Sequence, residues 1–283
     1  MNSSMSLCQN ATVLHDKNVA LIFTGVNTCI AVFATISNIV ALVGIWRGYT
    51  GNFKRTPKLL LSLFATNLMT VFALTSFSMY LFIETFPRYC LFSAHVSAIV
   101  FLVLWSSTEL FLVTLDRYLV IVNGVCYKLW KKHFLFLLVF EVIVMSGYSV
   151  FVYFSLCMLG CTFKLINIAC IASLIAINLF VSFVVNLLLA KFVKKKLSLA
   201  GRTRNMERSV VKTVKNITLS EGICQAVVIV MMILYIFSLR VSSFFEKLNY
   251  IFLLFIQMFS LMKCGIVPLT YIFSNKRIIE SLC

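Results

Sequence analysis

Long apolar runs alternate with short polar segments along most of the chain. Every run is longer than the roughly 20 residues that a helix needs to cross the hydrocarbon core of a bilayer. Apolar residues fill each run instead of occupying every second position, which predicts helices that are apolar on all sides. We therefore expect an all-α integral membrane protein, a seven-transmembrane helix bundle whose helices cover 18–46, 57–83, 91–122, 133–157, 164–192, 210–239 and 247–273.

The composition places nearly the whole chain in the membrane. Apolar residues make up 61% of the 283 residues and charged residues only 12%, whereas a soluble domain averages about 45–50% apolar and about 25% charged residues. The mean hydropathy is +1.00. The length leaves no room for a separate soluble domain, so we predict an outer tail over 1–17, a membrane domain over 18–273 and a short inner segment over 274–283.

The excess of positive charge predicts the orientation of the helices. The formal net charge is +16, and most basic residues follow the first, third, fifth and seventh runs. Basic residues accumulate on the cytoplasmic side of membrane proteins, so the N-terminus is predicted outside and the C-terminus inside. A nucleic-acid partner is excluded, because the charge lies between apolar runs and no soluble surface carries it.

Two features near the N-terminus agree with this orientation. The sequons at Asn2 and Asn10 predict glycosylation on the outer side. The first run has neither a basic start nor a small-residue cleavage site. It is therefore predicted to be a membrane anchor and not a removable signal peptide.

The third run ends in an acid-base-aromatic triplet, Asp116-Arg117-Tyr118, and the stretch from this triplet to Tyr127 reads DRYLVIVNGVCY. Seven runs, an outside N-terminus and this stretch together resemble a rhodopsin-like (class A) G-protein-coupled receptor. The third helix of many such receptors ends in a pattern like DRYLAIxxPLxY. Tyr127 is in register with that pattern, and Gly124 stands where the family usually has proline.

Other runs resemble the same family in part. Asn38 matches the buried amide of the family's Gly-Asn-x-x-Val pattern, and Asn67 stands where an Asp is usual. Pro268 and Tyr271 match Asn-Pro-x-x-Tyr with its Asn absent, and residues 272–278 resemble the start of the family's short amphipathic helix along the inner membrane face. The sixth run has no Cys-Trp-x-Pro, the fifth no Pro and the fourth no Trp, as in a divergent member.

The resemblance implies a receptor of the plasma membrane that transduces an extracellular or membrane-borne signal to heterotrimeric G proteins, with a ligand or without one. Arg117 would contact the G-protein α-subunit when the inner end of the sixth helix swings outward, with Tyr271 rearranging beside it. Glu207 would pair with Arg117 in the resting state. The residues implied in coupling and activation are Asp116, Arg117, Tyr118, Tyr127, Glu207, Pro268 and Tyr271.

The basic stretch over 191–215 has two interpretations. In the resembled family such a segment flanks the G-protein groove. Basic residues near anionic lipid are also attracted by about 1 kcal/mol each, which explains most of the charge and does not exclude the first interpretation.

The resemblance also implies a disulfide at the outer ends of the helices. It would join Cys90 to Cys161, or to Cys157, and tie the third helix to the loop after the fourth. Free thiols at helix ends are the alternative.

Four ionisable residues interrupt the apolar runs, namely Glu109, Glu141, Glu221 and Lys263. A charge at the bilayer centre costs on the order of a few kcal/mol, so each residue marks a candidate functional site. Glu109 is predicted to face Ser62 or Glu141. Two neighbouring acids favour the protonated form of one of them.

Lys263 stands where the resembled family often has an Asn that lines a sodium pocket. We predict that its ammonium takes the place of the sodium ion, held by Asn67, Asn38 or Glu221, so that activity is insensitive to sodium. The alternative is an ion pair with an acid that serves packing alone. With Glu109, these residues make up the predicted buried polar network.

Two other classes of function fit parts of the pattern. A membrane transporter would use the intramembrane charges as a substrate or proton path, but no inverted repeat is visible. A non-signalling scavenger or partner-binding seven-helix protein would explain the altered sixth and seventh runs, but not the intact triplet. The sequence contains no metal-spaced His/Cys cluster, nucleophile elbow or phosphate loop, so we expect no enzyme, metal or cofactor.

Overall fold

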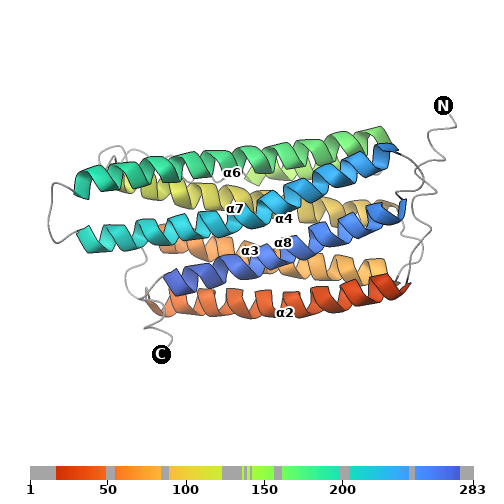
Figure 1. Ribbon diagram of the computed structural model, residues 1–283, viewed down its shortest axis with the longest axis horizontal. Helices are drawn as coiled ribbons and strands as arrows, with labels where there is room; N and C mark the ends of the chain where they lie inside the picture. Colours follow the sequence, from red (N-terminus) through yellow and green to blue (C-terminus); the bar gives the residue numbers. More distant parts are fainter. Residues whose placement is uncertain are drawn as a thin grey trace.

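The apolar runs form long helices that lie side by side along one axis (Figure 1). The computed structural model describes residues 17–48, 55–83, 89–122, 136, 139–140, 142–155, 161–197, 204–241 and 246–274. The long helices are α2 (Lys17–Gly48), α3 (Arg55–Ile83), α4 (Tyr89–Val122), α6 (Cys161–Leu197), α7 (Arg204–Val241) and α8 (Glu246–Ser274). A shorter apolar helix covers Val142–Ser155.

Five of the described helices are long and apolar enough to cross a bilayer. Their crossing segments are Leu21–Arg47, Lys58–Met79, Ala94–Asp116, Lys215–Phe237 and Ile251–Ser274. This finding confirms the prediction of an all-helical, multi-pass membrane protein. The short helix that is predicted after Ser274 lies outside the described residues.

The helices pack around the bundle as a closed ring. In order, α2 packs on α3, α3 on α4, α4 on α6, α6 on α7, α7 on α8, and α8 back on α2. The contact between α7 and α8 is the most extensive, whereas α4 touches α7 only narrowly across the centre. Figure 1 shows α2 and α6 at opposite edges of this arrangement.

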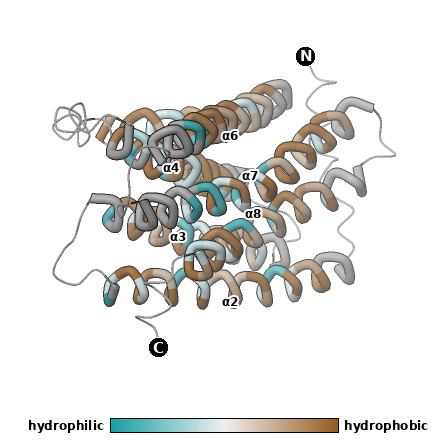
Figure 2. Tube along the Cα trace, turned by 60° about the vertical axis from the view of Figure 1, so that its left-hand side comes forward, coloured by the Kyte–Doolittle hydropathy of each residue, from teal (hydrophilic) through white to brown (hydrophobic). Residues whose placement is uncertain are grey.

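The bundle has an apolar exterior, and its interior contains buried polar side chains among clusters of apolar ones. Large apolar side chains point outward on several helices, and Phe180 and Phe237 are each 68% exposed. Figure 2 shows hydrophobic residues along the outer helices. Asn38, Asn67 and Glu109 are fully buried instead. This distribution is typical of a protein whose solvent is lipid, where polar side chains turn toward neighbouring helices.

A close seam between α2 and α8 fixes the position of α8. A Cβ atom on Gly265 would lie 2.8 Å from the Phe33 ring and 3.3 Å from Cα of Ala34. The missing side chain of this glycine therefore lets the two helices approach closely, as small residues do in membrane bundles. Lys263 lies two residues before Gly265, so this seam sets the depth of Lys263 in the bundle.

Both α6 and α7 are longer than the bilayer requires. They contain 37 and 38 residues, which corresponds to about 55 Å of helix against a hydrocarbon core of about 30 Å. They also exceed the apolar runs predicted at 164–192 and 210–239. In Figure 1 both extend past α2 and α8 at the end where α6 terminates at Leu197 and α7 begins at Arg204.

Candidate functional site

A buried layer of polar side chains crosses the bundle at the depth of Lys263 on α8. The Lys263 ammonium lies 2.9 Å from Oε1 of Glu221 on α7 and donates to Oγ of Ser106 on α4 at 3.2 Å. Ser106 donates in turn to Oδ1 of Asn67 on α3 at 2.9 Å. One lysine thus connects side chains of four helices.

Glu221 receives a second donor from its own helix. Gln225, one turn further along α7, donates from Nε2 to the same Oε1 at 2.7 Å. The side chains of Glu221 and Lys263 are only 1% and 6% exposed. At this burial each charge depends on the other, because removal of one partner leaves an uncompensated charge in the interior.

Asn38 on α2 does not contact Lys263. Its amide nitrogen donates to the carbonyl oxygens of Ala34 in its own helix and Cys264 in α8, both at 2.8 Å. The predicted bond from the Lys263 ammonium to Asn38 is not formed, because Oδ1 of Asn38, the atom that would accept it, has no hydrogen-bond partner. The bond from Asn38 to Cys264 attaches α2 to the backbone beside Lys263 instead.

Glu109 on α4 lies in a different polar environment, against α3. Its side chain is fully buried, and the Ser62 hydroxyl donates to Oε1. Thr66 and Trp105 face the same carboxyl group, while Oε2 has no hydrogen-bond partner. Of the two predicted neighbours, Ser62 is in contact and Glu141 lies outside the described residues.

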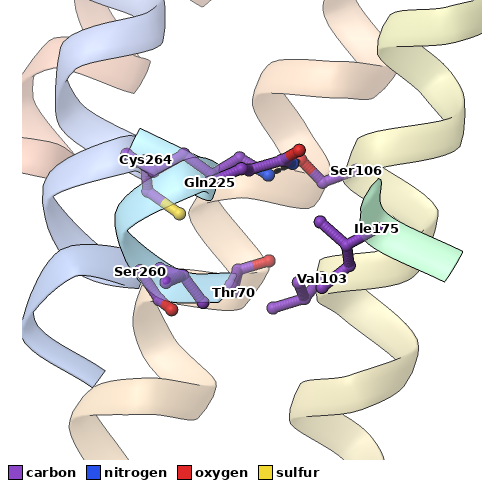
Figure 3. A pocket seen from close by; sticks show the side chains of 9 residues that line it. Thr70, Val103, Ser106, Ile175, Gln225, Ser260 and Cys264 are labelled. Atoms are coloured by element: carbon purple, nitrogen blue, oxygen red, sulfur yellow. Dashed lines mark hydrogen bonds between the residues drawn. The ribbon is translucent and has the colours of Figure 1, made fainter. Parts of the chain in front are cut away.

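A small cavity adjoins the Lys263 layer on the side toward the Tyr89 end of α4. Its volume is about 10 Å³, close to the space that one buried water molecule needs. Figure 3 shows side chains converging on it from several helices, with polar atoms from Thr70, Ser106, Gln225 and Ser260 and apolar walls from Val103 and Ile175.

The crossing segments share a charged end, which we call the Asp116 end. The segments terminate there in Arg47, Lys58, Asp116, Lys215 and Ser274. Asp116 is buried and Tyr118 is half-buried. Arg117 belongs to α4, but its side chain lies outside the described residues.

Hydrogen bonds join α7 to α8 at the Asp116 end. The Thr213 hydroxyl donates to the carbonyl oxygen of Ser274, and Nδ2 of Asn216 donates to Oγ of Ser274, each at 3.0 Å. Tyr271, one turn before Ser274, is buried with its ring centroid 5.3 Å from that of Phe64 on α3. We call this set of contacts the α7–α8 joint.

Pro268 lies inside α8 and is buried. A proline has no N–H, so α8 lacks one backbone hydrogen bond in the turn between Lys263 and the joint. The two parts of the candidate site therefore lie on either side of a weakened helical turn.

Several predicted residues fall on parts of the chain without a structural description. Tyr127, Cys157 and the sequon residues Asn2 and Asn10 lie outside the described residues. Glu207, Cys90 and Cys161 belong to helices, but their side chains are likewise outside that description.

The sequence interpretation missed Ser106 and Gln225. Each lies one helical turn from a buried acid, Ser106 before Glu109 and Gln225 after Glu221. Polar residues at this spacing on an apolar helix lie on the same face as the charge, which is the signal that could have found them.

A second polar cluster lies toward the Tyr89 end and was also not predicted. Gln257 donates to the carbonyl oxygen of Leu74 at 2.6 Å and to the Ser78 hydroxyl. Asn27 donates to the same hydroxyl at 3.4 Å. These bonds connect α2, α3 and α8 at the other end of the bundle.

No group of three or more His, Cys, Asp or Glu side chains that could hold a metal ion occurs within the described residues. Within the described residues, the arrangement offers charge and hydrogen bonding.

Comparison with known proteins adds no family assignment. No protein-family model matches the chain, and no curated protein matches it either.

Proposed function

We propose that the chain is a divergent rhodopsin-like G-protein-coupled receptor, which passes an extracellular or membrane-borne signal to heterotrimeric G proteins. The observation that carries the proposal is the α7–α8 joint, where Thr213 and Asn216 both bind Ser274. This joint lies at the same end of the bundle as the triplet at 116–118. A joint that holds α7 to α8 beside the coupling triplet leaves the narrow contact between α7 and α4 as the one that can open, as a transducing protein needs.

The charge distribution supports the membrane topology that this function requires. Arg47, Lys58 and Lys215 end their crossing segments on the side of Asp116, and the opposite ends of the described helices carry fewer basic residues, namely Lys17, Lys164, Arg240 and Lys247. Basic residues mark the cytoplasmic side. We infer that the Asp116 end faces the cytosol, with an outside N-terminus and seven crossings that include Val142–Ser155 and α6 in the plasma membrane.

The packing suggests which helices move. The inner end of α7 is bound to α8 through the joint, while its contact with α4 is narrow. Separation of α7 from α4 would break few contacts and would uncover the Arg117 region for a G-protein α-subunit. A ligand shifts this equilibrium only by the difference between its affinities for the closed and the open bundle.

The Lys263 layer lies between the cavity and the joint, so it is in a position to relay such a shift. Its ammonium occupies the interior as a fixed cation, bound to Glu221 and Ser106. We expect that replacing sodium by N-methylglucamine leaves signalling unchanged. A clear dependence on sodium would contradict this role of Lys263.

The test of the proposed function is basal G-protein activation in cells that express the chain without added ligand. We expect activity above that of untransfected cells and its loss in Arg117→Ala. Arg240→Ala, at the opposite end of α7, is the matched control and should keep the activity. Absence of activity across all G-protein classes would favour a non-signalling partner-binding protein, and unchanged activity in Arg117→Ala would reject the assigned role of the triplet.

A transporter is the second candidate, because a buried ion pair beside a water-sized cavity is also found on proton and substrate paths. Proton flux into liposomes under an imposed membrane potential distinguishes the two. The receptor proposal predicts no flux above empty liposomes, and a flux that Lys263→Met abolishes would favour transport.

A further inference from the structure

The charges of the buried interior do not cancel at the depth of Lys263. Among the described residues, Glu109 and Glu221 are acids with 0% and 1% exposure there, and Lys263 is the base. Lys263 binds Glu221 at 2.9 Å, and its other bond goes to Ser106. One ammonium therefore compensates one of the two carboxyl groups.

Among the described residues, Glu109 has no cation of its own. Its hydrogen-bond donor is the neutral hydroxyl of Ser62, and its Oε2 has no partner. The acid that acts on it electrostatically is Glu221, which carries the same sign and so gives no compensation. An ionised carboxylate in such a place costs far more than a neutral acid, so a buried acid without a counter-charge takes up a proton instead.

The remaining oxygen atoms of the layer do not offer a metal ion a set of ligands. Metal ions of the hard class require several oxygen ligands at once. Asn67 uses Oδ1 to accept from Ser106, and Ser106 accepts from Lys263. Beside Glu109 this leaves the hydroxyls of Ser62 and Thr66 on α3, which are fewer oxygen ligands than such an ion requires.

We propose that Glu109 is a proton-binding site: the closed bundle holds it as a neutral carboxylic acid, and a proton, not a metal ion, balances the charge of the interior. Oε1 accepts from Ser62 and Oε2 carries the proton. This inference goes beyond the proposed signalling function and does not depend on it, because it concerns the protein without a G protein.

Infrared spectroscopy of the purified full chain in lipid discs at neutral pH tests the proposal. Only buried acids stay protonated at that pH, and a protonated carboxyl group has its own carbonyl stretching band. We expect this band in the wild type, its loss or weakening in Glu109→Gln and its persistence in the double variant Glu221→Gln/Lys263→Met. Glu109→Met serves as a second variant if Glu109→Gln does not fold.

Two results would overturn the proposal. One is a wild-type spectrum without the band, or a band that is unchanged in both variants of Glu109. The other is a sodium effect, which is measured as the melting temperature in sodium chloride against N-methylglucamine chloride. Equal melting temperatures in both salts support the proton, and sodium-specific stabilisation of the wild type that Glu109→Gln removes would assign the site to a metal ion.

Discussion

Glu109 and Glu221 are the same amino acid at nearly the same burial, yet their surroundings differ in kind. Glu221 accepts from the Lys263 ammonium and the Gln225 amide, whereas Glu109 accepts from the hydroxyl of Ser62. The difference follows from the helices that face each acid, since α7 packs closely on α8 while α4 packs on α3. The burial of an intramembrane acid therefore does not determine its role. The group that faces the carboxyl determines it.

The largest effect is expected from Lys263→Met. The substitution leaves Glu221 buried without a counter-charge, and loss of one partner of a buried pair costs about 3–5 kcal/mol. Thermal and chemical unfolding of the purified protein in detergent measures this loss. Lys215→Met, which removes an exposed lysine of the same helix bundle, is the control. Equal stability of the two variants would show that Lys263 does not stabilise the fold through Glu221.

A smaller loss is expected from Ser106→Ala. It leaves the Lys263 ammonium with one contact fewer and Oδ1 of Asn67 without a donor, for a loss of about 1–3 kcal/mol. Ser173→Ala is the matched control, because that exposed serine bonds only to a carbonyl of its own helix. If both serine variants unfold alike, Ser106 does not connect α3 to the ion pair.

The double variant Lys263→Met/Glu221→Gln should regain most of the stability that Lys263→Met loses. Neutral replacement of both partners of a buried pair is often close to neutral, so we expect a net change within about 1 kcal/mol. A double-mutant cycle with the two single variants measures the coupling between them. Additive losses would mean that the two charges do not stabilise one another.

The smallest effect is expected from Glu109→Gln. An amide of the same shape still accepts from Ser62 and carries no charge, so the change in stability should stay within about 1 kcal/mol. The same replacement at Glu221 leaves Lys263 unpaired and should cost several times more. Equal losses at the two positions would show that both acids are ionised in the closed bundle.

The helices were predictable from the sequence because a bilayer crossing requires length and apolar character, which the runs display directly. The ends of α6 and α7 were not, since their basic residues continue the helix past the apolar part. The contacts between buried polar side chains were harder still to predict, because they depend on the depth of one helix relative to another. The bond from Asn38 to the Cys264 carbonyl is an example, since a backbone acceptor leaves no trace in the sequence.

Nucleotide exchange on purified G-protein α-subunits tests the central claim most directly. The chain is reconstituted in lipid discs, and exchange is compared for the wild type, Arg117→Ala and empty discs. We expect faster exchange with the wild type than with empty discs and a return to the empty-disc rate in Arg117→Ala. Equal rates in all three samples, for every class of α-subunit, would contradict the claim.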